Sequence, residues 1–150
     1  MTPEAAEEPS LLPIGWKEYI AFPEWGLRRL RAKIDTGATT SALDVASCDV
    51  EDTPSGPMAR LSVVLNRRRP DKVKVVRLPV VRTVVVRNSS GSAESRPVVA
   101  ALMRLGPVEK RIHITLTRRK GMRCRMLLGR EALSGAFLVD VRRKYVYSSV

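Results

Sequence analysis

A single aspartate in a short turn is the side chain of this sequence best placed for acid–base chemistry. Asp35 follows an apolar and basic segment and precedes Thr36, Gly37 and Ala38. Two carboxylates held close together share one proton, so that the ionised one can activate water while the neutral one polarises a carbonyl. Asp35 could supply one carboxylate of such a pair. The alternative is a turn residue whose carboxylate bonds only its own backbone.

The residues after Asp35 limit what the turn could do. Gly37 allows the backbone to turn tightly and to approach a substrate closely. Ala38 has no hydroxyl that could stabilise the ionised form of Asp35, so we expect a less acidic optimum than Ser or Thr would give at this place. An activity profile that peaks below about pH 3.5 would contradict this reasoning.

A second segment of interest is the run from Met126 to Leu133. It contains Leu128, Gly129 and Arg130, and Gly129 lies 94 positions after Asp35. On their own these residues are consistent with a buried strand that ends in a turn glycine. If Asp35 is catalytic, they are scaffold for its turn and take no part in the chemistry.

The elements that must position these residues are predicted to be strands. Alternating apolar residues, many valines and turn signals every 8–12 residues or so indicate an all-β barrel or sandwich, with one short helical turn at 130–133. We expect a disordered acidic tail at 1–12, a single domain at 13–150 and a loop at 51–58. The expected strands are 14–22, 27–34, 39–43, 59–65, 73–79, 80–87, 97–105, 108–116, 122–128, 137–141 and 144–147.

Composition limits the class of protein. The chain has 150 residues, of which 44% are hydrophobic and 28% charged, as is typical of one globular domain. No apolar run reaches the ~18–20 residues of a membrane span, and the acidic N-terminus lacks the basic region of a signal peptide. We therefore expect no membrane partner, and the use of only two cysteines favours a reducing cytoplasm as the location. The two cysteines, Cys48 and Cys124, make no disulfide framework and are interpreted as plain thiols.

The net charge of +12 is spread along the chain. One interpretation is solubility alone, and the other is attraction to a polyanion, either nucleic acid or an acidic peptide. The basic runs contain no interleaved aromatic residues and no helix-turn-helix or zinc-finger spacing. Specific nucleic-acid recognition is therefore poorly supported.

The two segments together resemble a known class of enzyme. Asp35-Thr36-Gly37-Ala38 resembles the active-site turn of retropepsins, the half-sized aspartic proteases, and Leu127-Leu128-Gly129-Arg130 resembles their second signature. The resemblance implies a closed or nearly closed β-barrel, and a homodimer in which each subunit supplies one aspartate. Thr36 would then bond to the partner subunit's loop. The hairpin signal at Asn88, Ser89, Ser90 and Gly91 falls where the tip of the flap should lie, and residues 44–80 look like an insertion before it.

A narrower resemblance covers roughly residues 14–147 and points to a bacterial retropepsin-like family. The similar stretches are Ile14-Gly15-Trp16, 32–43, 96–99, 126–133 and 137–140. That family is often labelled an ATP-dependent zinc protease and is associated with an ATP-grasp ligase that adds glutamates to a ribosomal protein.

The zinc and the ATP named in that label do not fit this sequence. The chain has one histidine, two distant cysteines, no His-Glu-x-x-His and no Gly-x-x-x-x-Gly-Lys loop. We therefore expect no metal and no other cofactor. His113 is interpreted as an ordinary surface or partly buried histidine.

The sequence departs from its relatives at two places. Viral retropepsins have an acidic residue soon after the turn that pairs with the arginine of the second signature, whereas this chain has Thr39 and Thr40. Arg130 is therefore expected to find another partner, with Asp44, Asp140 and Glu131 as candidates. The bacterial family often has His where this chain has Asp44, which puts equivalent activity in question.

The resemblance implies an aspartic peptidase that hydrolyses amide bonds with activated water and forms no covalent intermediate. The basic surface suits a peptide or protein substrate with an acidic, glutamate-rich tail. The alternative is a non-catalytic basic binding module of the same fold for acidic peptides or ribosomal RNA. A third possibility is a degenerate relative that never dimerises.

Overall fold

The structure is a computed structural model that describes residues 10–66, 68–87, 89–118 and 124–147. Most of the expected acidic tail at 1–12 lies outside the described residues, but Leu12 begins the first strand. Across the described ranges, no helix is long and apolar enough to cross a membrane.

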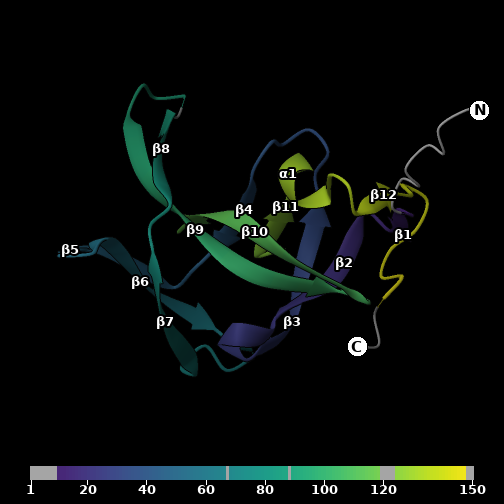
Figure 1. The fold of residues 1–150 in the computed structure, drawn as a ribbon, viewed down its shortest axis with the longest axis horizontal. Helices are drawn as coiled ribbons and strands as arrows, with labels where there is room; N and C mark the ends of the chain where they lie inside the picture. Colours follow the sequence, from purple (N-terminus) through teal and green to yellow (C-terminus); the bar gives the residue numbers. More distant parts are fainter. Residues whose placement is uncertain (1–9, 67, 88, 119–123, 148–150) are drawn as a thin grey trace, which may run out of the picture.

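Strands make up nearly all of the described regular structure, together with one short α-helix and one 3-10 turn (Figure 1). The bounds are β1 Leu12–Ile14, β2 Lys17–Phe22, η1 Pro23–Trp25, β3 Leu27–Ile34, β4 Ser41–Asp44, β5 Ser47–Thr53, β6 Gly56–Val64, β7 Val73–Pro79, β8 Arg82–Arg87, β9 Ala93–Leu105, β10 Val108–Thr117, β11 Met126–Leu128, α1 Arg130–Leu133 and β12 Phe137–Val139.

Six strands close into a barrel. They follow one another in the order β10, β4, β11, β3, β2 and β9, and β9 pairs again with β10. β8 extends this sheet by pairing antiparallel with the N-terminal part of β9. β1 and β12 form a separate parallel pair. The retropepsin-like all-β barrel with one short helix near the C-terminus, expected from the sequence, is confirmed within the described ranges.

The alternation of apolar and charged residues along the sequence explains why these segments form strands with one face buried and the other exposed. In β3, for example, Leu27, Leu30, Ala32 and Ile34 are buried, whereas the basic residues between them are exposed. Successive side chains of a strand point to opposite faces, so an alternating sequence covers the barrel core and keeps its charges in solvent. The same barrel core receives Leu43, Met103, Ile114, Met126 and Leu128 from four other strands. β3 is therefore fixed along its whole length, up to the residue that precedes Asp35.

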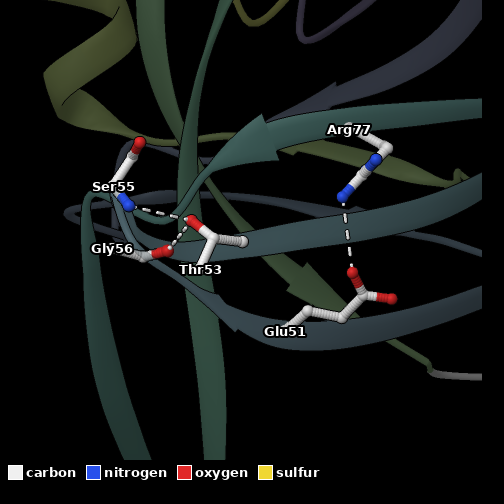
Figure 2. Close-up of polar contacts among 5 residues, drawn as sticks. All are labelled: Glu51, Thr53, Ser55, Gly56 and Arg77. Atoms are coloured by element: carbon white, nitrogen blue, oxygen red, sulfur yellow. Dashed lines mark hydrogen bonds and ion pairs between the residues drawn. The ribbon is translucent and has the colours of Figure 1, made fainter.

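Residues 47–79 form a sheet of their own, in the order β5, β6, β7. The expected loop at 51–58 is wrong, because β5 and β6 pair up to the turn at Pro54 and Ser55. Figure 2 shows what holds this turn: the hydroxyl of Thr53 donates to the carbonyl of Gly56 at 2.6 Å, and the Ser55 N–H donates to Thr53 Oγ1 at 3.3 Å. A surface ion pair of 3.3 Å joins Arg77 of β7 to Glu51 of β5.

Two expectations near the ends of the chain are also wrong. The single strand expected at 14–22 is divided at Gly15 into β1 and β2, and the strand expected at 144–147 is absent from that described segment. One fully buried side chain accounts for both. The Glu18 carboxylate accepts the N–H groups of Gly15 at 2.7 Å, Val146 at 3.0 Å and Tyr147 at 3.1 Å. These N–H groups bond to a side chain and are not available to a neighbouring strand.

Candidate active site

The turn that contains Asp35 joins two strands that are not neighbours in the sheet, because a third strand lies between them. The turn connects β3 to β4, and β11 lies between these two strands. β11 pairs in parallel with β3, with Leu128 opposite Ile34, and antiparallel with β4, with Met126 opposite Leu43. Figure 1 shows the connection passing beside α1, which follows β11 directly. The sequence segments around Asp35 and Gly129, predicted to belong together, are therefore adjacent.

Asp35 sits at the start of this turn, half-buried. Its N–H donates to the carbonyl of Leu128 at 2.9 Å, which fixes the backbone to β11. Its Oδ1 accepts the N–H of Gly37 at 2.9 Å. This is the bond of an Asx turn, so it is compatible with both interpretations of Asp35. Among the described residues no other donor reaches the carboxylate, and Oδ2 is left for water, substrate or a second carboxylate.

Gly129 lets the two segments approach each other. A Cβ placed on Gly129 would lie 2.5 Å from the carbonyl oxygen of Thr40 and 2.9 Å from that of Ala38. Any other residue would therefore force backbone atoms apart. The Gly129 N–H donates to the buried hydroxyl of Ser41 at 3.1 Å, which adds a further tie between the turn and β11.

The first turn of α1 holds the carbonyl groups of the Asp35 turn. The N–H of Arg130 donates to Ala38 at 2.8 Å, and that of Glu131 donates to Thr39 at 3.0 Å. N–H groups at the start of a helix have no partner within the helix, and here the turn supplies them. The helix and the turn thus satisfy each other's backbone groups.

The guanidinium of Arg130 bonds to the turn and not to a carboxylate. It donates to the carbonyl of Thr36 at 3.2 Å and to the hydroxyl of Thr39 at 3.0 Å. The acidic partner expected from the sequence is therefore wrong for the described residues. Asp140 instead accepts two hydrogen bonds from the Arg142 side chain, and this pairing holds the pKa of Asp140 below its usual value. Thr39 replaces the missing acid with a neutral acceptor.

The outer surface of the turn is open. Thr36 and Gly37 are exposed, whereas Ala38 is half-buried against the barrel. This is the surface on which a second copy would have to lie if two Asp35 side chains are to meet.

The long hairpin of β8 and β9 projects from the barrel on the same upper side of the view as the Asp35 turn (Figure 1). Its last pair is Arg87 with Ala93. Ser89, Ser90 and Gly91 lie in the connecting turn, where Gly91 has a φ of 85°, whereas Asn88 lies outside the described residues. The hairpin expected from the sequence is thus found, and its role as a flap stays a prediction.

Two further residues bear on the site. Lys110 of β10 was not among the candidates selected from the sequence. Its Nζ donates to the carbonyls of Glu131 at 3.2 Å, Ala132 at 2.9 Å and Ser134 at 2.8 Å. It therefore closes the C-terminal end of α1.

His113 is exposed, with Nδ1 3.2 Å from Arg82 Nη1, as expected for a surface histidine. Within the described ranges, no three His, Cys, Asp or Glu side chains gather as a metal site would require.

The chain is similar to several known proteins. The model of the RimB-like family, described as retropepsin-like aspartic endopeptidase RimB, matches residues 13–149. Over 129 residues the chain is 33% identical to a probable alpha-L-glutamate ligase of Desulfotalea psychrophila and 36% identical to one of Parasynechococcus marenigrum. These matches take in 85% of this chain but 27% of each relative, so the chain spans about a quarter of the length of these curated relatives.

A solved structure shares the fold. The crystal structure of a protein of unknown function from Legionella pneumophila matches with a TM-score of 0.76 and 25% identity, over 91% of this chain and 98% of that one.

Proposed function

The chain belongs to the RimB-like family of retropepsin-like aspartic endopeptidases, and we propose that it is an aspartic peptidase in which Asp35 of two subunits forms the catalytic pair. One observation carries the proposal: β11 and α1 hold the Asp35 turn through the Leu128 carbonyl and the N–H groups of Arg130 and Glu131, while one oxygen of Asp35 has no partner among the described residues. An aspartate that only stabilises its own turn does not require its backbone to be held by a second strand and a helix.

The proposed reaction needs only water and the two carboxylates. In the dimer the two Asp35 side chains share one proton, because both cannot be ionised at close range. The ionised carboxylate takes a proton from water, which attacks the peptide carbonyl, while the protonated carboxyl donates its proton to the carbonyl oxygen. The tetrahedral intermediate then collapses: the C–N bond breaks, the proton taken from water passes to the leaving amine, and the proton on the former carbonyl oxygen returns to the carboxylate pair. The Gly37 N–H keeps Oδ1 oriented throughout. The nucleophile is water, so no covalent intermediate with the protein forms.

The exposed Thr36 side chain supports the proposed dimer. It stands next to Asp35 on the open surface of the turn, and its hydroxyl can bond to the partner subunit's turn. Arg130 holds the Thr36 carbonyl at 3.2 Å, so the hydroxyl is presented from a fixed backbone. A two-fold arrangement would bring each Thr36 to the other subunit and both Asp35 carboxylates to the axis.

We propose an acidic peptide as the substrate, such as a glutamate-rich tail. The net charge of +12 favours association with a polyanion. The half-buried Arg96 and the exposed Arg82 and Arg87 belong to the flap-like hairpin, beside which a bound peptide would lie. The curated relatives are named glutamate ligases, which is consistent with a substrate rich in glutamate but says nothing of cleavage.

Replacement of Asp35 by Asn tests the proposal. We expect D35N to lose more than about 1,000-fold in kcat/KM on a glutamate-rich peptide, a loss of about 4 kcal/mol of transition-state stabilisation. Its unfolding temperature and sedimentation should match those of the parent. The control is D52N, which removes the same charge from an exposed position in β5, and it should retain activity.

The competing function is a non-catalytic module that binds acidic peptides or ribosomal RNA. It is favoured by the arginines of the hairpin and by the Asx-turn bond of Asp35. Under that alternative the parent protein binds the glutamate-rich peptide without cutting it, and D35N binds equally well. Cleavage by the parent that disappears in D35N, with peptide binding retained, excludes this module as the sole function.

A further inference from the structure

A cavity of about 630 Å³ lies at the end of the barrel away from Asp35. The start of β3 and the connection between β6 and β7 form its walls, and both lie at the bottom of the view in Figure 1. A volume of this size is within the range of small-molecule sites. Five arginines line it, namely Arg28, Arg29, Arg31, Arg68 and Arg125.

No acidic side chain is present among the described residues that line the cavity. Arg28, Arg29, Arg31 and Arg68 also form no ion pair with any described carboxylate. Elsewhere the chain pairs its arginines, as with Arg77 and Arg111, although those residues are well exposed. Like charges gathered around one concave surface repel one another, and an anion placed between them removes this repulsion.

The aromatic residues beside the cavity hold two of these arginines. The Arg29 guanidinium lies 4.1 Å from the centroid of the Tyr19 ring, and Tyr19 stacks on Tyr145 at 4.7 Å. A hydrogen bond from Arg31 lowers the pKa of Tyr19, as expected where positive charge surrounds the hydroxyl. The Tyr19 ring therefore contacts both Arg29 and Tyr145, which positions this arginine at the cavity.

The chemistry of the walls favours phosphate over carboxylate. Planar guanidinium groups bind phosphate oxygens in pairs, and several can surround one phosphate chain. In an extended acidic peptide, successive side chains point to opposite sides, so carboxylates on one side are ~7 Å apart. Consecutive phosphoryl groups place more negative charge in the same volume. A compact anion therefore matches the cavity better than a peptide tail does.

We propose that this cavity is a binding site for an anion with consecutive phosphoryl groups, either inorganic polyphosphate or the polyphosphate part of a nucleotide. The site binds this anion and does not hydrolyse it. Arg28 lies seven positions before Asp35 along β3, a span of roughly 23 Å at the rise of a strand. Arg31 is the lining residue nearest to Asp35 along β3, four positions before it, and Asp35 itself does not line the cavity. The test of this site therefore requires no peptide cleavage.

Calorimetric titration and thermal unfolding of the full chain test the proposal at constant ionic strength. The probes are sodium tripolyphosphate, ATP and a hexaglutamate peptide. We expect saturable binding of tripolyphosphate and an unfolding temperature that rises with its concentration, because a ligand that binds the folded state stabilises it. If ATP binds more tightly than tripolyphosphate, the ligand of the site is the polyphosphate part of a nucleotide. If ATP binds equally or more weakly, the ligand is inorganic polyphosphate.

Two matched pairs of substitutions locate the site. Arg28→Gln with Arg68→Gln removes one arginine from each wall, and we expect tripolyphosphate affinity to fall at least about 10-fold. Arg60→Gln with Arg77→Gln removes the same charge from two residues that face each other on β6 and β7 and do not line the cavity. This control should change the affinity less than about 2-fold.

Three results would overturn the proposal. One is equal loss of affinity in both pairs, which would mean that the anion senses only net charge. Another is the absence of saturable tripolyphosphate binding. The third is tighter binding of hexaglutamate than of tripolyphosphate, with hexaglutamate affinity lost in the Arg28/Arg68 double variant but not in the Arg60/Arg77 control. That result would assign the cavity to an acidic peptide.

Discussion

At the scale of single residues, the Asp35 turn depends on one position at which no side chain fits. Gly129 passes so close to the carbonyls of Thr40 and Ala38 that a methyl group would collide with both. The sequence predicted that Asp35 and Gly129 belong to one site, because both stand in recognisable short runs. It did not predict what Arg130 would contact, since Thr39 offers a neutral hydroxyl where an acid was expected.

We predict that Gly129→Ala impairs the site more than it impairs the fold. The added Cβ must push the Asp35 turn away, at a cost of about 1–3 kcal/mol in the free energy of unfolding. Peptidase activity should fall at least about 100-fold even at temperatures where the variant is folded. Activity and chemical denaturation measured together check both values.

The control for this prediction is Gly135→Ala. Gly135 has a φ of 76°, so alanine is strained there, but its Cβ would meet no atom within 4 Å. We expect a similar loss of stability, about 1–2 kcal/mol, with activity retained. Equal activity of the two variants would show that the close approach at Gly129 does not govern the turn.

At the scale of elements, α1 is held from both ends by other parts of the chain. Its four residues are too few for a helix that is stable by itself. The Asp35 turn binds its first N–H groups, and Lys110 of β10 binds its last carbonyls. The sequence predicted the bounds of this helix correctly. It could not identify Lys110, because the contact joins residues more than 20 positions apart and any exposed-looking lysine on a strand gives the same pattern.

Lys110→Met is expected to loosen α1 while keeping the aliphatic part of the side chain. Loss of the three bonds to carbonyls should lower the free energy of unfolding by about 1–2 kcal/mol. Hydrogen exchange of the N–H groups of residues 130–133 should accelerate. Lys74→Met, an exposed position on β7, is the matched control and should leave both quantities unchanged within about 0.5 kcal/mol.

The C-terminal segment is attached by a buried carboxylate rather than by a strand pair. Glu18 is inaccessible to solvent and accepts three backbone N–H groups, two of them from residues nearly 130 positions away. The pattern of the sequence favoured a strand at 144–147. That prediction failed because alternating residues do not reveal that a distant side chain already binds the backbone.

Glu18→Gln should release this segment. An amide offers one acceptor oxygen and turns N–H groups toward backbone donors, at a cost of about 2–3 kcal/mol in the free energy of unfolding. Limited proteolysis should then cut within 140–147 faster than in the parent. Glu51→Gln, which removes an exposed carboxylate paired with Arg77, should cost less than about 1 kcal/mol and leave the cleavage rate unchanged.

At the scale of the whole molecule, the proposed activity depends on assembly. Each chain contributes one Asp35, so a monomer lacks half of the catalytic pair under the proposed mechanism. The barrel itself could be predicted from alternating apolar residues, and so could the family, from two short motifs. The separate sheet of β5, β6 and β7 could not be predicted in full, because Pro54, Ser55, Gly56 and Pro57 indicated a long loop where a tight turn is found.

Specific activity should therefore rise with protein concentration. We expect it to fall steeply on dilution below the dissociation constant of the dimer, in step with the loss of dimer measured by sedimentation velocity. Mixing the parent with an excess of Asp35→Asn chains should suppress activity further, because mixed dimers hold one carboxylate. Activity per chain that is constant on dilution into the monomeric range would refute the shared pair.

The insertion of β11 between β3 and β4 has a consequence for biosynthesis. Ile34 of β3 and its partner Leu128 of β11 are 94 positions apart, and parallel pairing of these strands cannot occur until the later strand has left the ribosome. Contacts so distant along the chain form slowly. A nascent polypeptide therefore carries an unsupported Asp35 turn until β11 and α1 have been synthesised, so this turn reaches its final conformation only after β1–β10 have been made.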